Sequence, residues 1–361
     1  MAIFHFQAGY TSRSGSKSVC AHAAYIAGLV LEDDRTGQIW DYSKRQKSSI
    51  FSTILAPSGT PEWVYDAQKL WNAAESFEDN IAHQRFKGHK DPVKNQKSLA
   101  AKEKFLMTCK TSYTVMFGLP IEIEDREHQK ELAQRLVQAC YVDYDLIAQY
   151  VIRDKGDNPC LHAIITTRPL LENGTFSKKR FVIDKRKLFE IRAEVARIAN
   201  MFGQEKGYNY NLDPRSYKEQ GINLIPTRKV GIKMKSPSYQ RKLLENEDIK
   251  RQNIEMILTH PEEIIKVVIS GKKSFTQEDI IAEISKHLGE DAQYYAIMKA
   301  KIEGQDMTDI MNEIYSSGLS AINKEESLSI LESFSAQILS HEMLISIGEN
   351  SKGETLYKFK G

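Results

Sequence analysis

The chain has 361 residues, of which 41% are hydrophobic and 27% are charged, a composition typical of a globular protein with two domains. Its net charge of only +2 excludes a uniformly basic nucleic-acid coat protein. The sequence lacks an apolar run long enough for membrane insertion and lacks the basic-then-apolar order of a secretory signal, so we expect a cytoplasmic protein. The four cysteines have no paired short spacing and are expected to be reduced thiols.

Positive charge is concentrated in two segments. Residues 85–110 carry eight Lys and Arg against two acids, and residues 215–251 carry ten against four, so each segment has a local charge of +6. Fields of this sign attract phosphate backbones, although a solvated loop and a solvated linker have the same composition. The side chains that we predict to bind DNA are Arg13, Lys17, Lys94, Lys97, Lys102, Lys104 and Arg168.

The first part of the chain alternates between strand and helix patterns. Strands are predicted at 2–8, 49–57, 112–120, 146–153 and 160–169, and helices at 19–31, 61–79, 125–143 and 185–207. Segment 85–104 has little apolar periodicity and is expected to be an irregular insertion. This order predicts an α+β fold with two layers, in which a largely antiparallel sheet carries its helices on one face.

Three regions are expected along the chain: a first domain over 1–230, a basic linker over 231–258 that becomes helical near Ser238, and a second domain over 259–361. The second domain shows three helix patterns and then a hairpin with Gly353 in its turn. Three helices followed by a hairpin is the winged-helix plan. The helix that begins after Thr276 has an acidic start, so a protein contact or a structural role is as consistent with this domain as DNA reading.

The N-terminal strand, polar turn and helix form a candidate phosphodiester site. The helix presents Tyr25 and His22, and a tyrosine hydroxyl can attack a DNA phosphate while keeping the bond energy in a phosphotyrosine ester. The unpaired N–H groups of the helix start, with Arg13 and Lys17, can bind the phosphate. A tyrosine in an alanine-rich helix is more often a core or boundary residue, so this pattern is weak by itself.

A second candidate site lies in the segment DNPCLHAIITTRP. Cys160 and His162 are two residues apart on a predicted strand, so their side chains face the same way. Such a pair can contribute two ligands to zinc or another transition metal. A buried cysteine beside a hydrogen-bonded histidine is the structural alternative.

At these two places the sequence resembles the MobA/MobL relaxases, and in particular the TraA-type conjugative relaxases. The resemblance covers most of the first 230 residues, through MAIFHFQAGYTSRSGSKSVCAHAAYIAG, DDRTGQIWDYSK, ILAPSGTPEW, LWNAAESFED, DNPCLHAIITTRPL and DPRSYKEQGINLIPTRKVG. It continues into THPEEIIKVVISGKKSFTQEDIIAEI, which is similar to the TraA segment between relaxase and helicase. The resemblance implies an HUH endonuclease-like domain in which Tyr25 is the nucleophile, with His22 in reserve.

The resemblance also implies a divalent metal, Mg, Mn or Zn, that polarises the scissile phosphate. The family usually presents three metal-binding histidines, but this chain has Ile152 and Cys160 at two of those positions and keeps only His162. The histidine that the family has before RSY is replaced by Pro214. An isoleucine cannot bind a metal, whereas a cysteine thiolate favours zinc over magnesium or manganese.

Three functions therefore follow as hypotheses. The first is a relaxase that nicks single-stranded DNA at an origin of transfer and forms a 5′-phosphotyrosyl intermediate, with relaxosome and type IV secretion coupling proteins as partners. The second is a catalytically degenerate relaxase-like protein that still binds DNA but has lost the full metal site. The third is an accessory protein that uses the second domain for partner contact.

Overall fold

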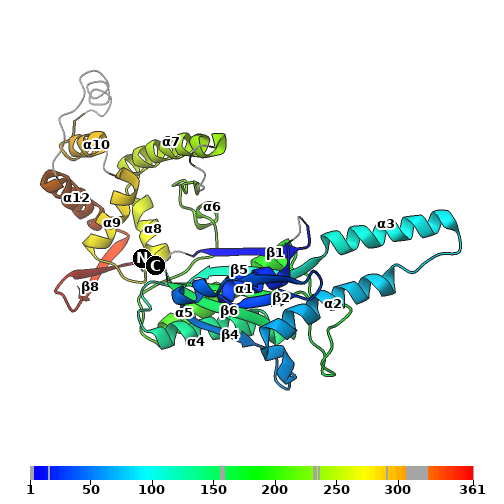
Figure 1. Ribbon diagram of the computed structural model, residues 1–361. Helices are drawn as coiled ribbons and strands as arrows, with labels where there is room; N and C mark the ends of the chain where they lie inside the picture. The colour runs from blue at the N-terminus through cyan, green and yellow to red at the C-terminus, as the bar shows by residue number, and fades with distance from the viewer. Residues whose placement is uncertain are drawn as a thin grey trace. The chain divides into compact units, whose positions relative to one another are not determined.

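The structure is a computed structural model that describes residues 4–14, 17–154, 159–230, 234, 236–289, 292–305 and 324–360. The chain divides into two compact units, one up to Tyr208 and one from Asn209 onward. In Figure 1 the first unit is coloured from blue to green and the second from green to red.

The first unit is built on a five-stranded antiparallel sheet in the order β1-β5-β7-β6-β4. The strands are β1 (Phe6–Ser12), β4 (Ser49–Leu55), β5 (Lys110–Gly118), β6 (Ala148–Asp154) and β7 (Pro159–Thr166). A separate short hairpin joins β2 (Val30–Asp33) to β3 (Gln38–Asp41), and 3-10 turns lie at Ser43–Ser48 (η1), Glu62–Tyr65 (η2) and Val142–Tyr144 (η3). The predicted antiparallel α+β architecture is confirmed.

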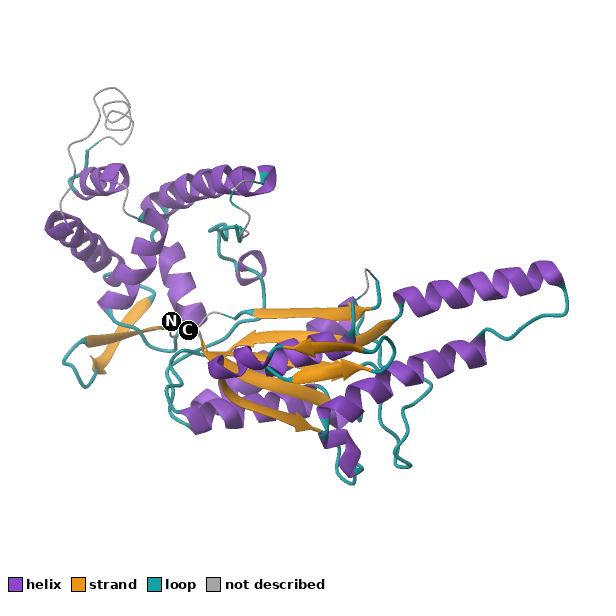
Figure 2. Ribbon diagram, in the orientation of Figure 1, coloured by secondary structure: helices purple, strands orange, loops and turns teal. Residues whose placement is uncertain are grey.

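Helices cover both faces of this sheet, so the two-layer arrangement with helices on one face was wrong (Figure 2). Helix α1 (Val19–Ala27) shares a core with α2 (Ala67–Arg85) and with Val151 and Ile164 of the sheet. Helices α4 (Arg126–Cys140) and α5 (Lys185–Glu205) pack on each other. The Lys130 Nζ of α4 lies 5.5 Å from the ring centroid of Phe51, which is 5.9 Å from that of Tyr150 on the opposite face. Strand residues that are apolar on both faces require this double cover.

The segment expected to be irregular contains a helix, α3 (Pro92–Thr108). This helix has no buried residue, and its apolar residues show no helical periodicity. The carboxylate of Asp91 caps its start by accepting a hydrogen bond from the Lys94 N–H, and Pro92 occupies the first turn. Because no face of α3 enters a core, hydrophobic periodicity could not reveal the helix. Figure 1 shows α2 and α3 as neighbouring helices joined at their outer ends.

The second unit contains α6 (Tyr217–Gln220), α7 (Pro237–Thr259), α8 (Glu262–Gly271), α9 (Gln277–Leu288), α10 (Ala292–Ile302) and α12 (Lys324–Leu339), with the hairpin β8 (Leu344–Glu349) and β9 (Thr355–Phe359). The three predicted helices and the hairpin are present, and α7 begins next to Ser238. Ile222 and Leu224 pack in the core of this unit, so its chain begins earlier than the expected boundary at 230. The winged-helix assignment stays a prediction.

Two further expectations concern cysteines and membranes. Cys20, Cys109, Cys140 and Cys160 are all free thiols, and the first three are buried. Within the described ranges, no helix combines the length and the apolar character that a bilayer span requires.

Candidate active site

Helix α1 presents Tyr25 because its other face is made of small residues that pack closely on the sheet. Ser18 caps the helix by accepting hydrogen bonds from the N–H groups of Cys20 and Ala21. Ala23 and Ala24 are fully buried. Tyr25 falls on the outer side of the helix and keeps 43% of its surface exposed. Of the two structural alternatives, a core or a boundary residue, the structure excludes the core position.

The end of α1 is fixed by a glycine and an arginine. Gly28 adopts a left-handed conformation with φ of 70°, and a Cβ there would lie 2.7 Å from the backbone nitrogen of Gln46. The guanidinium of Arg153, a buried residue of β6, donates to the carbonyl oxygens of Ile26 at 2.5 Å and Tyr25 at 3.5 Å. A cation at this position satisfies carbonyls that the last helical turn leaves unpaired and complements the helix dipole.

Tyr25 and the Cys160–His162 pair meet at one cavity of about 290 Å³. The fold brings these two parts of the sequence together because α1 packs across β7. The cavity is lined by Tyr25, Ile26, Arg45, Met116, Arg153, Cys160 and His162.

Arg45 lies directly over Tyr25 at this cavity. Its guanidinium carbon is 3.8 Å from the centroid of the Tyr25 ring, and its Nε donates to the Tyr25 carbonyl at 3.2 Å. The ring of Tyr42 contacts Tyr25 edge-on, with centroids 5.4 Å apart. A cation over the ring face and an aromatic edge beside it hold the phenol in one orientation.

His22 lies in a second hollow that also includes Tyr25. Its Nδ1 is 2.6 Å from the Thr11 Oγ1, and the hollow is lined in addition by Lys17, Trp40 and other residues. Burial, with a smaller contribution from the charge of Lys17, lowers the pKa of His22 below its usual value. The imidazole is therefore neutral at pH 7.

The ligand pair predicted for a metal is present, but a complete ligand set is not. Cys160 and His162 share one face of β7, as predicted. Ile152 pairs with Leu161 and faces the other side of the sheet, where it is fully buried. Among the described residues, no three His, Cys, Asp or Glu side chains come together in a metal-binding group. Burial raises the pKa of the Cys160 thiol, which disfavours the thiolate that a metal needs. These residues do not fit the three-ligand site of the family.

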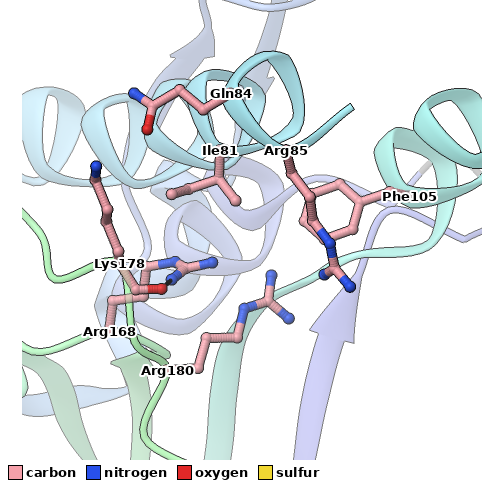
Figure 3. A pocket seen from close by; sticks show the side chains of 7 residues that line it. All are labelled: Ile81, Gln84, Arg85, Phe105, Arg168, Lys178 and Arg180. Atoms are coloured by element: carbon pink, nitrogen blue, oxygen red, sulfur yellow. Dashed lines mark hydrogen bonds between the residues drawn. The ribbon is translucent and has the colours of Figure 1, made fainter. Parts of the chain in front are cut away.

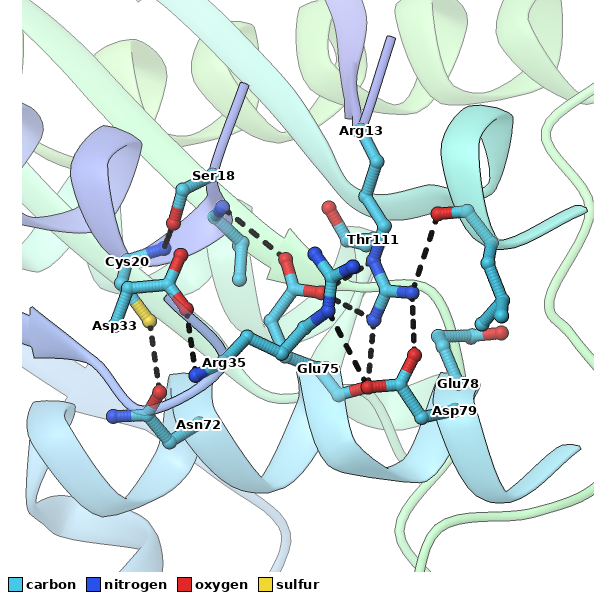
Figure 4. A network of polar contacts seen from close by, with 12 residues as sticks. Arg13, Ser18, Cys20, Asp33, Arg35, Asn72, Glu75, Glu78, Asp79 and Thr111 are labelled. Atoms are coloured by element: carbon cyan, nitrogen blue, oxygen red, sulfur yellow. Dashed lines mark hydrogen bonds and ion pairs between the residues drawn. The ribbon is translucent and has the colours of Figure 1, made fainter. Parts of the chain in front are cut away.

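Arg13 forms part of a buried ion-pair network rather than a DNA-facing surface (Figure 4). Its guanidinium is 2.6 Å from the Glu75 carboxylate and 2.6 Å from that of Asp79, and only 2% of its side chain is exposed. Glu75 also accepts a hydrogen bond from the Val19 N–H at the start of α1. The placement argues against a direct DNA contact by Arg13, and makes it the link between β1, α1 and α2.

Arg168 is buried in the same manner. Its Nε and one terminal nitrogen donate to the two carboxylate oxygens of Glu78, at 2.7 and 3.0 Å, and the other terminal nitrogen donates to backbone carbonyls of Ser177 and Lys178. Four of the five guanidinium N–H groups of Arg168 are therefore used inside the protein. Lysines predicted to bind DNA are arranged differently, because Lys17, Lys94, Lys97 and Lys104 are exposed and Lys102 is half-buried.

Arg45 and Arg153 were missed in the sequence. Arg45 belongs to a short polar 3-10 turn, and Arg153 to the strand before the hairpin turn. Neither position belongs to a recognisable motif. Charge counts could not have revealed them, since each arginine is significant only because the fold brings it to the end of α1. The replacement Pro214 lies in the second unit.

The model of the MobA/MobL family matches residues 17–88 and 99–241, which make up more than half of the chain. The chain belongs to the MobA/MobL family. The matched residues include the helix of Tyr25 and the strand of His162.

Individual relatives agree with this membership. The chain is 25% identical over 339 residues to a conjugal transfer protein TraA of Agrobacterium fabrum, covering 82% of this chain and 28% of that protein. It is 25% identical to a mobilization protein MobL of Acidithiobacillus ferridurans, over 64% of this chain and 62% of the relative. The chain thus spans about 28% of the length of the TraA relatives.

A solved structure from a study of vancomycin resistance transfer in Staphylococcus aureus is also similar, with 23% identity and a TM-score of 0.48 over 60% of this chain and all of that one.

Proposed function

We propose that this protein is a relaxase that nicks single-stranded DNA at an origin of transfer, with Tyr25 as its nucleophile. The observation that carries the proposal is the exposed phenol of Tyr25 at a cavity shared with Arg45, Arg153 and His162. The conjugal transfer and mobilisation relatives supply the substrate class. Relaxosome and type IV coupling proteins are the partners that this role implies.

The reaction exchanges one phosphate ester for another. The Tyr25 oxygen forms a bond to phosphorus, the bond from phosphorus to the 3′ oxygen of the upstream nucleotide breaks, and the tyrosine keeps the 5′ end. The phenolic proton leaves to a base, and the 3′ oxygen gains a proton. Because the ester bond energy is kept, the strand can be rejoined by the reverse reaction.

Residues around Tyr25 have the chemistry that this reaction needs. Arg45 uses its Nε on the Tyr25 carbonyl, and its terminal nitrogens can donate to the non-bridging phosphate oxygens. The Thr11 Oγ1 forms a hydrogen bond with Nδ1 of His22. In this proposal the neutral His22 donates its Nδ1 proton to the Thr11 hydroxyl oxygen, which leaves Nε2 to accept the phenolic proton. We assign these roles to Arg45 and His22.

The family resemblance also implies that the reaction depends on a metal ion. A divalent ion in this family polarises the scissile phosphate. The described residues contribute only Cys160 and His162 to such a site, so no step of the reaction is assigned to a metal.

The incomplete ligand set favours a second candidate function, a relaxase-like protein that binds DNA without cutting it. Loss of a metal removes several kcal/mol of transition-state stabilisation, which lowers the cleavage rate by orders of magnitude. Binding depends mainly on basic contacts and base stacking and can persist.

One experiment separates the two functions. The purified protein is incubated with labelled oligonucleotides from several origins in Mg²⁺, Mn²⁺, Zn²⁺ or a chelator, and adducts that survive denaturing electrophoresis are counted. The wild type is expected to form an adduct, and Tyr25→Phe is expected to form none. Tyr42→Phe is the matched control, because this ring touches Tyr25 in the same hollow. Binding without adduct in every condition would establish the second function.

A further inference from the structure

A third pocket, of about 450 Å³, lies away from Tyr25, between the α2–α3 pair and the segment that follows β7 (Figure 3). Three arginines and a lysine line it together with one aromatic ring: Arg85, Arg168, Lys178, Arg180 and Phe105, with Ile81 and Gln84 completing the wall. None of these described lining residues is acidic. We propose that this pocket is a binding subsite for single-stranded DNA, which takes a backbone phosphate and a stacked base.

Glu78 holds two of the arginines that line the pocket. The carboxylate is 2% exposed and accepts hydrogen bonds from both Arg168 and Arg180. Arg168 then holds the chain at Ser177 and Lys178 through their carbonyl oxygens. A buried acid that is shared by two arginines fixes their guanidinium groups in place before any ligand arrives, which lowers the entropic cost of binding an anion.

One carboxylate leaves most of the positive charge in the pocket uncompensated. Arg85 and Lys178 are exposed. Arg180 uses one terminal nitrogen on Glu78, at 2.7 Å, while its buried Nε has no acceptor among the described residues. Figure 3 shows the guanidinium groups of Arg85, Arg168 and Arg180 directed toward a common space. Guanidinium groups suit phosphate oxygens in geometry as well as charge.

Phe105 supplies the feature that distinguishes a nucleic acid from a simple anion. Its ring lines the pocket, and the Arg180 guanidinium carbon lies 5.8 Å from its centroid. Phe86 flanks it at 5.9 Å. Phosphate-binding cations beside an aromatic face are the combination that single-stranded DNA requires.

This inference rests on the proposed function, in which single-stranded DNA reacts at Tyr25. The position of the pocket would give the same DNA strand a second contact on the protein. Arg168 lies two residues beyond the last residue of β7, whereas Cys160 is the second residue of that strand. Strand residues rise about 3.3 Å each, so the two sites are separated by the length of β7, on the order of 20 Å. A bound strand would therefore contact the pocket several nucleotides from the scissile phosphate.

Binding of a labelled oligo-dT to the Tyr25→Phe protein tests the subsite, since no covalent step can contribute. We expect Arg85→Gln with Lys178→Gln to lower the salt slope of the binding constant by about 1.4, at roughly 0.7 per lost phosphate contact. Phe105→Leu is expected to weaken binding on the order of 10-fold. Arg186→Gln, a 90% exposed cation on α5, is the matched control.

Two outcomes would overturn the subsite. One is an unchanged slope and affinity in all pocket variants. The other is displacement of the oligonucleotide by dTMP or inorganic phosphate at equal concentration, which would make the pocket a mononucleotide or phosphate site. Adduct formation by Tyr25 is scored separately. If the wild type forms an adduct but the pocket variants leave the salt slope unchanged, only the subsite proposal fails. If the pocket variants alter the salt slope but the wild type forms no adduct, only the proposed nicking activity fails.

Discussion

The inner part of α2 and the neighbouring helix α3 are both rich in charge, yet they use it in opposite ways. Glu75 and Glu78 of α2 are buried and paired with arginines from β1 and from the end of β7. Helix α3 has no buried residue, and its lysines are exposed except for the half-buried Lys102. One group of charges holds the sheet and helices together, while the other is available to a ligand. Charge alone does not distinguish them, because the distinction depends on burial.

The energetic reason is the cost of desolvation. A buried charge without a partner costs several kcal/mol, whereas an exposed ion pair contributes about 0–1 kcal/mol. Burial raises the pKa of Glu75, and the charge of Arg13 opposes that rise. Each buried carboxylate of α2 therefore requires its arginine, and substitutions in the two helices should have different consequences.

The largest expected effect is at the buried network. Arg13→Ala leaves Glu75 buried without its cation, so we expect the free energy of unfolding to fall by about 3–5 kcal/mol in urea denaturation. Lys69→Ala, an exposed cation on α2, is the control. If Arg13→Ala kept its stability but lost DNA affinity, Arg13 would be a DNA contact after all and the comparison would fail.

The opposite result is expected for α3. Replacing Lys94, Lys97, Lys102 and Lys104 by Gln should change the free energy of unfolding by no more than about 0.5 kcal/mol. The salt slope of single-stranded DNA binding should decrease by about 0.7 for each lysine that contacts a phosphate. An unchanged slope would show that this helix does not touch DNA.

A third expected effect concerns His22, a half-buried titratable group that lines the hollow beside Tyr25. Its folded-state pKa is lowered, so the unfolded chain binds a proton first as the pH falls. Stability should be complete above about pH 6.5 and decrease below it, by at most about 1.4 kcal/mol per pH unit from this group. His22→Gln should remove that part of the slope, with the exposed His83→Gln as control. An identical pH profile in both variants would contradict the lowered pKa of His22.

The sequence predicted the antiparallel sheet, most helices and the shared face of Cys160 and His162, because these follow from local periodicity. It did not reveal α3, which has no buried face. The second helical layer was missed although the apolar residues on both faces of β6 and β7 require it. Arg13 and Arg168 were assigned to DNA because their partners Glu75 and Glu78 are distant in the chain. Arg45 and Arg153 were not predicted as site residues because their partners at the end of α1 are also distant in the chain.

The proposed site also depends on that distant packing. Tyr25 is exposed because Ala23 and Ala24 are buried, and it faces Arg45 because Gly28 lets the 3-10 turn approach the helix end. None of these relations is local in the sequence. A histidine placed at Ile152 would face the opposite side of the sheet from His162 in this register, so a single substitution does not restore the family's ligand set.

The most direct measurement of the central claim is the identity of the residue that carries DNA. Trypsin separates the three tyrosines that line the hollow at α1 into different peptides: Tyr10 in residues 1–13, Tyr25 in 18–35 and Tyr42 in 36–44. Mass spectrometry of the digested adduct should find the nucleotide on Tyr25 within SVCAHAAYIAGLVLEDDR. A nucleotide on Tyr10 or Tyr42, or unmodified tyrosine in all three peptides after incubation with a bound origin strand, would contradict Tyr25 as the nucleophile.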